Sequence, residues 1–348
     1  MELWQLGRTG VQVSKLCLGA MMFGAWGNTD HEECIRIIHR ALEAGINFID
    51  TADVYSAGES EEIVGKALKG RRDNVVLATK AHMPVGDDTD PNHRGNSRRW
   101  IIEEVENSLR RLGTDWIDLY QIHRPDPDTD IDETLSVLSD LVHQGKVRYI
   151  GHSTFPASEI VEAQWVADRR GRERFRCEQP PYSILTRAIE HDVLPTCQRY
   201  GMGVIPYSPL AGGWLSGRYR KSEAAQGPMS PARQRLANRF DLSLPENQRK
   251  LDAVEQLTQL ADEAGISLIE LAIAFVLRHP AVTAAIIGPR TMDHLESQLP
   301  AADTVLSDDI LDRIDQINPP GVTINYADNG WTQPALQPAL RRRPEEAA

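Results

Sequence analysis

Residues 117–153 read IDLYQIHRPDPDTDIDETLSVLSDLVHQGKVRYIGHS, and this stretch decides the fold. Its first part, Ile117–His123, is a short apolar run of the kind that forms a buried strand. Its middle, Ile131–Gln144, repeats apolar residues at helical spacing and stops at Gly145, a residue typical of helix C-termini. Its last part, Val147–Ser153, is a second strand pattern. This order predicts two parallel strands joined by a right-handed crossover.

The same alternation continues along the chain and predicts an α/β fold. Further helical patterns cover His31–Ala44 and Ile101–Leu112, and a capping box over Ser267–Glu270 opens an apolar helix. A doubly wound sheet and a barrel both satisfy this pattern. Three observations favour a (β/α)8 TIM barrel. The chain has eight predicted strands, and most of their ends are spaced by the length of one βα unit. No GxGxxG motif follows the first strand, as a dinucleotide-binding open sheet would require. The predicted strands are Leu16–Gly19, Ile46–Asp50, Val75–Lys80, Ile117–His123, Val147–Ser153, Phe175–Gln179, Gly203–Tyr207 and Ala284–Gly288.

The segments around this barrel have patterns of their own. Residues 1–13 predict a short hairpin before the first strand. Residues 209–246 follow the seventh strand and are rich in Gly, Ser, Pro and Arg, which predicts a mobile loop or lid, and an extra helix follows over 247–264. We therefore expect one barrel domain over residues 1–320 and a frayed C-terminal tail over 321–348.

The composition excludes several classes of protein. The 348 residues include 38 Lys and Arg against 50 Asp and Glu, a formal net charge of −12 that argues against general binding to nucleic acid or to anionic membranes. No secretory pattern is recognised at the N-terminus, and the longest apolar stretch is too short to span a bilayer. The four cysteines form no CxxC pair, which favours reduced thiols, a cytoplasmic location and no metal site.

Polar side chains end most of the predicted strands, whereas the strand interiors are interpreted as apolar. Burial alone does not explain why these runs end in titratable or hydrogen-bonding groups. In a (β/α)8 barrel the carboxyl ends of the strands meet at one face, where the active site lies. We therefore expect these residues to share one site with Tyr55, which lies five residues after the second strand. The residues at the strand ends are Asp50, Lys80, His123, Ser153, Gln179 and Tyr207.

Four of these residues suit the reduction of a carbonyl group. Lysine is not a usual metal ligand, so Lys80 argues against a metal site. An ammonium near the phenol of Tyr55 is expected to lower its pKa from the usual value of about 10, which improves the phenol as a proton donor. Asp50 would hold Lys80 charged and in place, and His123 would orient a carbonyl oxygen. The set predicts hydride transfer to carbon from a cofactor and a proton from Tyr55 to oxygen.

Each of these residues also has a simpler interpretation when it is taken alone. Asp53 competes with Asp50 as the carboxylate, and a carboxylate after a strand often only caps a loop. Lys80 could form a Schiff base, as lysines do in barrel aldolases. His123 alone is more often a hydrogen-bonded core residue, and Tyr55 alone could serve packing. The combination of the four at these places favours catalysis.

Several long segments carry a resemblance that covers residues 3 to about 318. They read GINFIDTADVYSAGESEEIVGKAL, LATK, SLRRLGTDWIDLYQIHRPD, GKVRYIGHS, QPPYS, PYSPLAGGWLSGRY and IIGPRTMDHLESQL. In these segments the chain resembles the aldo-keto reductase superfamily. It is most similar to the long-loop branch that includes the potassium-channel β-subunit and bacterial sugar-aldehyde reductases.

The resemblance implies a (β/α)8 barrel that binds NADP(H) in extended form without a Rossmann motif. It implies Tyr55 as acid and base, Lys80 and Asp50 as the pair that tunes the phenol, and His123 as the orienting residue. It also implies a small-molecule carbonyl substrate. Assembly into a homo-oligomer stays open.

Cofactor contacts also follow from the resemblance, position by position. Ser153 and Gln179 would hydrogen-bond the nicotinamide carboxamide, and Tyr207 would stack under the ring. Arg290 would bind an adenosine 2′-phosphate through paired donors, unless it is only an exposed surface cation. The loop after the seventh strand would wrap the pyrophosphate with Ser208, Leu210, Gly212 and Ser216. The turn after the eighth strand would meet phosphate through Gly288, Arg290 and Thr291. The next helix would hold adenine and its ribose with His294 and Gln298.

Two positions depart from the family pattern. Thr154 stands where the family usually has asparagine after the serine, and its shorter side chain puts a carboxamide contact in doubt. His152 replaces a hydrophobic residue, and it either faces the core or adds a polar group near the site.

Two functions of different classes stay open. The first is an NADPH-dependent carbonyl reductase, and the second is a channel-β-like regulatory subunit that binds NADP(H) with little turnover. The acidic charge and the four catalytic candidates favour the enzyme, and a lysine-dependent aldolase is a distant third. The substrate class stays open among sugar aldehydes, keto-sugars, aromatic aldehydes and quinone-like ketones. Candidates for the lining of the substrate pocket are Met22, Trp26, Tyr55, His82, Met83 and Arg124, with the 209–246 loop above them.

Overall fold

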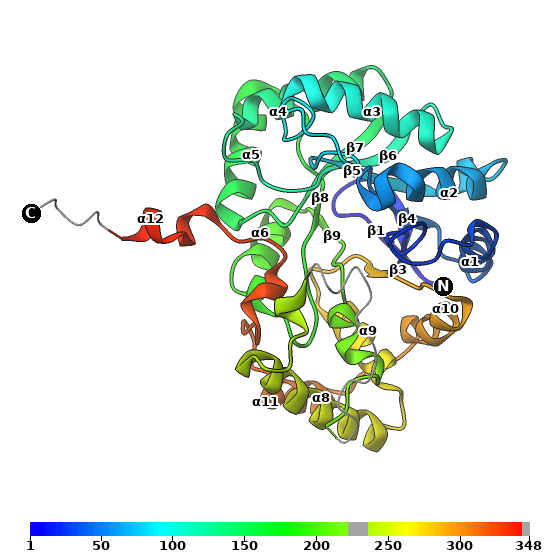
Figure 1. The fold of residues 1–348 in the computed structure, drawn as a ribbon, viewed down its shortest axis with the longest axis vertical. Helices are drawn as coiled ribbons and strands as arrows, with labels where there is room; N and C mark the ends of the chain where they lie inside the picture. The colour runs from blue at the N-terminus through cyan, green and yellow to red at the C-terminus, as the bar shows by residue number, and fades with distance from the viewer. Residues whose placement is uncertain (222–235, 343–348) are drawn as a thin grey trace, which may run out of the picture.

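Eight parallel strands form the centre of the molecule in a computed structural model that describes residues 1–221 and 236–342. They lie in the order β10-β3-β4-β5-β6-β7-β8-β9, with helices around them (Figure 1). The ring closes between the last two segments, because the Thr283 N–H donates to Val204 O (2.8 Å) and the Ile286 N–H to Pro206 O (2.9 Å). The predicted (β/α)8 barrel is therefore confirmed. The strands are β3 Leu16–Gly19, β4 Phe48–Asp50, β5 Val76–Ala81, β6 Ile117–Ile122, β7 Val147–Ser153, β8 Cys177–Gln179, β9 Gly203–Val204 and β10 Ala285–Ile287.

The helices follow the strands along the chain and cover the outside of the barrel. Two predicted helix starts are confirmed, since Asp30 caps α1 and Ser267 forms the expected capping box with Glu270. Helix α3 begins at Arg98, three residues before its predicted start, because Ser97 caps it. The α-helices of the described residues are α1 His31–Glu43, α2 Glu59–Leu68, α3 Arg98–Leu112, α4 Ile131–His143, α5 Ala157–Arg170, α6 Val193–Tyr200, α8 Pro245–Ala264, α9 Leu268–Arg278, α10 Met292–Gln298, α11 Asp308–Ile317 and α12 Pro338–Arg341.

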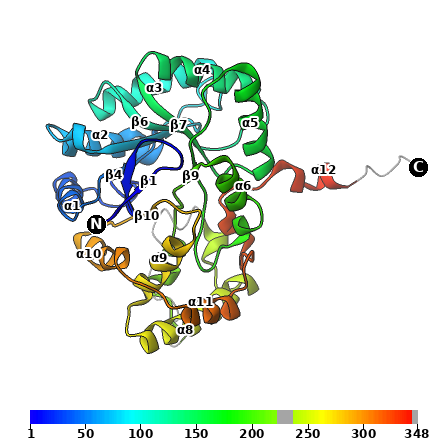
Figure 2. The ribbon, with the colours of Figure 1, turned by 180° about the vertical axis from the view of Figure 1, so that it is seen from behind.

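The predicted N-terminal hairpin is confirmed, and it closes the amino-terminal end of the barrel. Strands β1 (Leu3–Gln5) and β2 (Gln12–Ser14) pair antiparallel, and the hairpin lies in front of the barrel strands in Figure 2. Leu6 and Val13 are buried in one apolar cluster with interior residues of the barrel strands. This end is therefore filled with apolar side chains, which leaves the opposite, carboxyl end for polar chemistry.

The C-terminal segment differs from its prediction. Residues 321–330 were expected to fray, yet the Ile324 N–H donates to Leu185 O (3.1 Å) and Asn325 Nδ2 donates to Asn247 Oδ1 (2.8 Å). Lys250, which is fully buried on α8, pairs with Asp328 at 2.9 Å. Sequence periodicity could not reveal these contacts, because they join segments far apart in the chain. The domain division at residue 320 itself stays a prediction.

The cysteines, the helices and the predicted lid are described as follows. All four cysteines are buried without a disulfide. Within residues 1–221 and 236–342, no helix is long and apolar enough to cross a membrane, and no group of His, Cys, Asp or Glu could hold a metal ion. The central part of the expected lid, residues 222–235, lies outside the described residues. The cytoplasmic location stays a prediction.

A buried ionic cluster attaches helices α2 and α3 to the barrel. Arg111 on α3 bonds Glu61 of α2 through Nε (2.6 Å) and Glu104 through Nη2, and both carboxylates are fully buried. Glu61 also accepts a 2.5 Å hydrogen bond from the hydroxyl of Thr79 on β5. The guanidinium therefore neutralises two carboxylates that could not be buried alone at low cost.

Replacing this guanidinium should destabilise the fold. We expect Arg111→Met to lower the free energy of unfolding by about 3–5 kcal/mol, because two carboxylates then stay buried without a cation. Chemical denaturation followed by circular dichroism measures the change. The neighbouring Arg110→Met, at an exposed position, is the matched control. Equal midpoints for the two variants would contradict the argument.

Candidate active site

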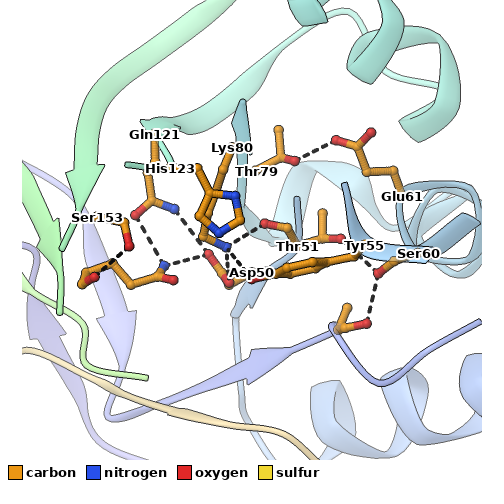
Figure 3. A network of polar contacts seen from close by, with 12 residues as sticks. Asp50, Thr51, Tyr55, Ser60, Glu61, Thr79, Lys80, Gln121, His123 and Ser153 are labelled. Carbon is orange, nitrogen blue, oxygen red and sulfur yellow. Dashed lines mark hydrogen bonds and ion pairs between the residues drawn. The ribbon is translucent and has the colours of Figure 1, made fainter. Parts of the chain in front are cut away.

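Asp50, Tyr55, Lys80 and His123 gather at the carboxyl end of the barrel (Figure 3). Lys80 on β5 places its ammonium 2.6 Å from Asp50 Oδ2 and 3.3 Å from the Tyr55 hydroxyl, and it also donates to Thr51 O at 2.7 Å. The four side chains are almost completely buried, with Lys80 at 0% exposure and Tyr55 at 9%. The structure therefore brings together all four residues that the sequence predicts at one site.

Two amides hold the other carboxylate oxygen of Asp50. Gln121 Nε2 donates to Asp50 Oδ1 at 3.1 Å, and Gln179 Nε2 donates to the same atom at 2.8 Å. Gln179 Nε2 also lies 3.2 Å from Gln121 Oε1. Both oxygens of Asp50 are thus occupied, which fixes the carboxylate that pairs with Lys80.

Tyr55 enters the site from a short 3-10 helix, η1 (Tyr55–Gly58), which begins five residues after the end of β4. Ser56 and Ala57 in this helix have left-handed backbone angles, with φ of 50° and 57°, a strained conformation for residues other than glycine. The Ser56 hydroxyl accepts the Trp26 N–H at 3.0 Å. The Tyr55 ring lies 5.9 Å from the Trp26 ring and 5.8 Å, edge to face, from the His123 ring. These contacts fix the direction of the phenol.

Burial and charge act in opposite directions on the titratable groups of the site. Burial raises the pKa of the Tyr55 phenol, and the positive charge of Lys80 opposes that rise. Burial disfavours the charged form of Lys80, but Asp50 and Tyr55 raise its pKa above the usual value. Burial, with the charges of Arg124 and Lys80, holds the pKa of His123 well below its usual value. At neutral pH the site therefore holds a neutral phenol, an ammonium and a neutral imidazole.

One expectation about these groups is wrong. The sequence predicts a lowered pKa for Tyr55 because of Lys80, whereas the pKa in the structure is raised. Lys80 does act in the expected direction, but the loss of solvent around the phenol is the larger effect. The sequence indicates that Lys80 lies near Tyr55, but it does not indicate how deeply the phenol is buried.

The structure also distinguishes the roles of Asp50 and Asp53. Asp53 is fully buried and bonds Lys80 only through the backbone, its N–H donating to Lys80 O at 3.2 Å. Burial and the nearby Glu104 and Glu61 raise the pKa of its carboxyl well above the usual value. One of its carboxylate oxygens receives the Val54 N–H at 2.6 Å, and the other has no partner among the described residues. Of these two carboxylates, the structure gives an ion pair with the Lys80 ammonium to Asp50, so Asp50 is the carboxylate of this site.

Residues at the ends of β7 and β8, and Tyr207 shortly after β9, lie beside the four central residues of the site. The Ser153 hydroxyl donates to Gln179 O at 2.8 Å, and Arg124 Nη1 lies 3.4 Å from the same hydroxyl. Thr154 has a left-handed φ of 62°, and its hydroxyl lies 3.4 Å from that of Tyr207. Thr154 therefore contacts Tyr207, the residue that is predicted to stack under the nicotinamide ring.

The loop after Tyr207 has an irregular backbone. Ser208 and Gly212 have positive φ values of 57° and 67°, and the Ser216 hydroxyl donates to Gly213 O at 2.7 Å. Leu210 precedes the 3-10 helix η4 (Ala211–Ser216). This geometry is compatible with a loop that follows a bound ligand, and the contacts predicted for Ser208, Leu210, Gly212 and Ser216 stay predictions.

The turn after β10 leads from Gly288 into α10. Asn28 Nδ2 donates to Arg290 O at 2.9 Å, and the Thr291 hydroxyl caps α10 by accepting the His294 N–H at 3.4 Å. Burial lowers the pKa of His294, with help from the charges of Arg290 and Arg218. On the same helix Gln298 is buried, and its Oε1 has no partner among the described residues. Two cations, Arg290 and Arg218, therefore lie near His294 on α10, a helix that also carries the buried Gln298.

His152 faces the core, the simpler of its two predicted placements. It is fully buried, pairs with Glu178 of β8 and stacks on Phe155 at 4.4 Å. Among the pocket candidates, Trp26 contacts Tyr55, and burial lowers the pKa of His82, whose Nδ1 lies 2.9 Å from Asn96 Oδ1. Met22 and Met83 are half-buried.

Several residues of this region are not recognised from the sequence. Gln121 bonds Asp50, Glu178 pairs with His152, and Arg218 lies close enough to influence His294. Gln121 and Glu178 are polar residues inside strands that were interpreted as apolar, and that interruption was the available signal. The expectation of apolar strand interiors is wrong at both positions, because each polar side chain has a buried partner. Nothing in the local sequence distinguishes Arg218 from other loop cations.

Comparison with known proteins agrees with this geometry. The family model described as Aldo/keto reductase family matches residues 15–319. Uncharacterized oxidoreductase YrpG of Bacillus subtilis (strain 168) is 42% identical over 328 residues, 92% of this chain and 96% of the relative. Aldo-keto reductase YhdN of the same organism is 38% identical over 303 residues, 85% and 87% of the two chains. A Schizosaccharomyces pombe protein provisionally named as a voltage-gated potassium channel subunit beta is 35% identical over 320 residues, 90% and 92% of the two chains.

These matches span almost all of the barrel, and they include both oxidoreductases and a channel subunit, as the predicted branch requires. The resemblance inferred from the sequence is confirmed, and the chain is an oxidoreductase-type barrel that belongs to the aldo/keto reductase family.

Proposed function

We propose that the protein is an NADPH-dependent carbonyl reductase in which Tyr55 donates the proton. The observation that carries this proposal is the buried chain of contacts from Asp50 through Lys80 to the Tyr55 hydroxyl, at 2.6 Å and 3.3 Å. The nicotinamide, when bound, supplies hydride to the carbonyl carbon of an aldehyde or ketone. The side chains of the site supply the proton, hold its donor in place and orient the substrate.

Tyr55 is suited to give its proton only when the reaction demands it. The raised pKa keeps the phenol protonated at neutral pH. As the carbonyl oxygen gains negative charge, the proton moves from the phenol to that oxygen, and the phenolate that is left lies 3.3 Å from the Lys80 ammonium. Lys80 therefore stabilises the product of the proton transfer more than its reactant.

His123 supports this step from the other side of the phenol. Its lowered pKa keeps the imidazole neutral, so it can donate one hydrogen bond to the carbonyl oxygen without adding a charge. Its Nδ1 is buried and has no partner among the described residues. The rings of Trp26 and His123 both lie within 6 Å of the Tyr55 ring, so a carbonyl that accepts the phenol proton would meet these two side chains as well.

The residues beside the four fit a nicotinamide dinucleotide. Gln179 uses its amide nitrogen on Asp50 and Gln121, which leaves Oε1 without a hydrogen-bond donor among the described residues and available to a carboxamide N–H. The Arg290 side chain makes no ion pair within the described part of the chain, and its charge reaches His294 together with that of Arg218. These two guanidinium groups fit the additional phosphate of NADPH, which NADH lacks.

A channel-β-like role is the second candidate, and the Schizosaccharomyces pombe relative is the observation in its favour. Such a subunit would bind the cofactor and turn over little. The complete and buried set of Asp50, Tyr55, Lys80 and His123 favours the enzyme, because a binding protein has no need of an acid placed against an ammonium.

Removing the phenol hydroxyl tests the proton donor. We expect Tyr55→Phe to lower kcat for NADPH-dependent aldehyde reduction by about 10²–10⁴-fold, the usual contribution of a positioned general acid. NADPH affinity should change little. The assay follows NADPH absorbance with a reactive aldehyde, and Tyr200→Phe, at the end of α6, is the matched control. Full activity in Tyr55→Phe would rule out this mechanism.

Removing the Arg290 guanidinium tests the cofactor preference. We expect Arg290→Ala to weaken NADPH binding by about 10–100-fold, since a charge-assisted hydrogen bond contributes roughly 1.5–3 kcal/mol, and to leave NADH binding nearly unchanged. Titration of nucleotide fluorescence measures both affinities. Arg313→Ala, an exposed arginine on α11, serves as the comparison. A loss of equal size for the two nucleotides would contradict the assignment of Arg290 to the 2′-phosphate.

A further inference from the structure

Strands β7 and β8 end in two neighbouring residue pairs. In the parallel register His152 lies beside Glu178, and Ser153 lies beside Gln179. Because successive side chains of a strand point to opposite faces, the two pairs face opposite sides of the barrel wall. Ser153 and Gln179 belong to the site, whereas His152 packs with Phe155 and Phe175 in the core between the barrel and its helices.

The outer pair is polar and fully buried. His152 Nδ1 bonds Glu178 Oε2, and both residues have no exposed surface. The imidazole stacks on the Phe155 ring at 4.4 Å and meets the Phe175 ring edge to face at 4.7 Å. Its Nε2 has no partner among the described residues. Apolar side chains would be buried here at lower cost, so packing alone does not account for this pair.

Glu178 holds the turn that follows Ser153. Its carboxylate contacts the His152 ring before the turn, and its Oε1 accepts the Phe155 N–H after the turn at 3.3 Å. Burial raises the pKa of Glu178, while His152 and the Thr154 and Phe155 N–H groups favour the charged form. Between these two anchors lies Thr154 with its left-handed φ of 62°. A residue other than glycine keeps such a conformation only where its surroundings impose it.

The turn and the end of β8 determine where Ser153, Thr154 and Gln179 lie. The Ser153 hydroxyl donates to Gln179 O, and the Thr154 hydroxyl lies 3.4 Å from that of Tyr207. Gln179 follows Glu178 directly in β8 and reaches Asp50 at 2.8 Å. A shift of Glu178 therefore moves the neighbouring amide, which is bonded to the carboxylate behind Lys80.

We propose that His152 and Glu178 are positioning residues that fix the nicotinamide end of the cofactor from outside the barrel wall. The proposal rests on the function proposed above. The pair holds the Ser153–Thr154 turn and the end of β8, and thereby the hydrogen-bonding groups that would meet the carboxamide. Neither residue touches cofactor or substrate, and the adenine end of the cofactor site does not depend on them.

A double variant separates positioning from stability. In His152→Leu/Glu178→Met both polar groups are replaced by apolar ones, so the thermal midpoint should stay equal or rise, as it often does when a buried ion pair is replaced in this way. We expect NADPH binding and the single-turnover rate of hydride transfer each to fall by about 5–30-fold, the effect of losing one or two hydrogen bonds. Binding of adenosine 2′,5′-bisphosphate, which lacks the nicotinamide, should stay within about twofold of the unsubstituted protein, because the variant loses no contact to that end.

A control pair and a second variant complete this experiment. His143→Leu/Glu173→Met carries the same substitutions at positions remote from the site and should change none of the three measurements. Glu178→Gln retains the shape of the side chain without its charge, and it should show the same selective loss at the nicotinamide end if the double variant does not fold.

Two results would overturn the proposal. Unchanged NADPH binding and hydride transfer in both variants would reduce the pair to a packing role. An equal loss for NADPH and adenosine 2′,5′-bisphosphate would show a general disturbance of the site instead of a local one. Failure of the unsubstituted protein to bind NADPH is a separate outcome, which would overturn the proposed function together with this inference.

Discussion

The ion pair between Lys80 and Asp50 is the constraint on which the rest of the site depends. Taking two charges out of water costs several kcal/mol for each ion, and their attraction offsets that cost only if the remaining polar atoms are also satisfied. Thr51 O, Gln121 and Gln179 provide those partners from three different strand segments. The pair is therefore stable only inside a closed barrel, and the closed barrel determines where the pair stands.

The same pair determines the behaviour of Tyr55. A phenol buried without a cation would keep its proton too firmly, because the phenolate would have no compensating charge. A phenol beside an ammonium in open water would feel that charge only weakly. At 3.3 Å from a buried ammonium that Asp50 holds in place, the phenol stays protonated at rest, and its anion is stabilised once the proton has left. Burial and charge are both needed, and each alone would give a poorer acid.

The sequence allows the barrel and the four central residues to be predicted because both depend on local patterns. Parallel strands in βα units share one carboxyl end, so the residues that close the strands must meet, whatever their distance along the chain. Local patterns alone leave Asp53 as a competitor of Asp50, because the choice depends on which side chain reaches Lys80. The direction of the Tyr55 pKa and the packing of residues 321–330 depend on burial and on contacts between distant segments, which periodicity does not encode.

The carboxyl end of the barrel wall is polar on both faces, unlike the apolar amino-terminal end. Lys80 faces the site while Thr79, its neighbour, bonds Glu61 on the outside, and Gln179 faces the site while Glu178 bonds His152. Residues that share a peptide bond cannot move independently by more than a small angle, because the peptide unit is planar and the strand is held on both sides. Buried ionic partners outside the wall therefore limit the motion of the groups inside it, and the precision of a site made on short strands depends on side chains that never contact a ligand.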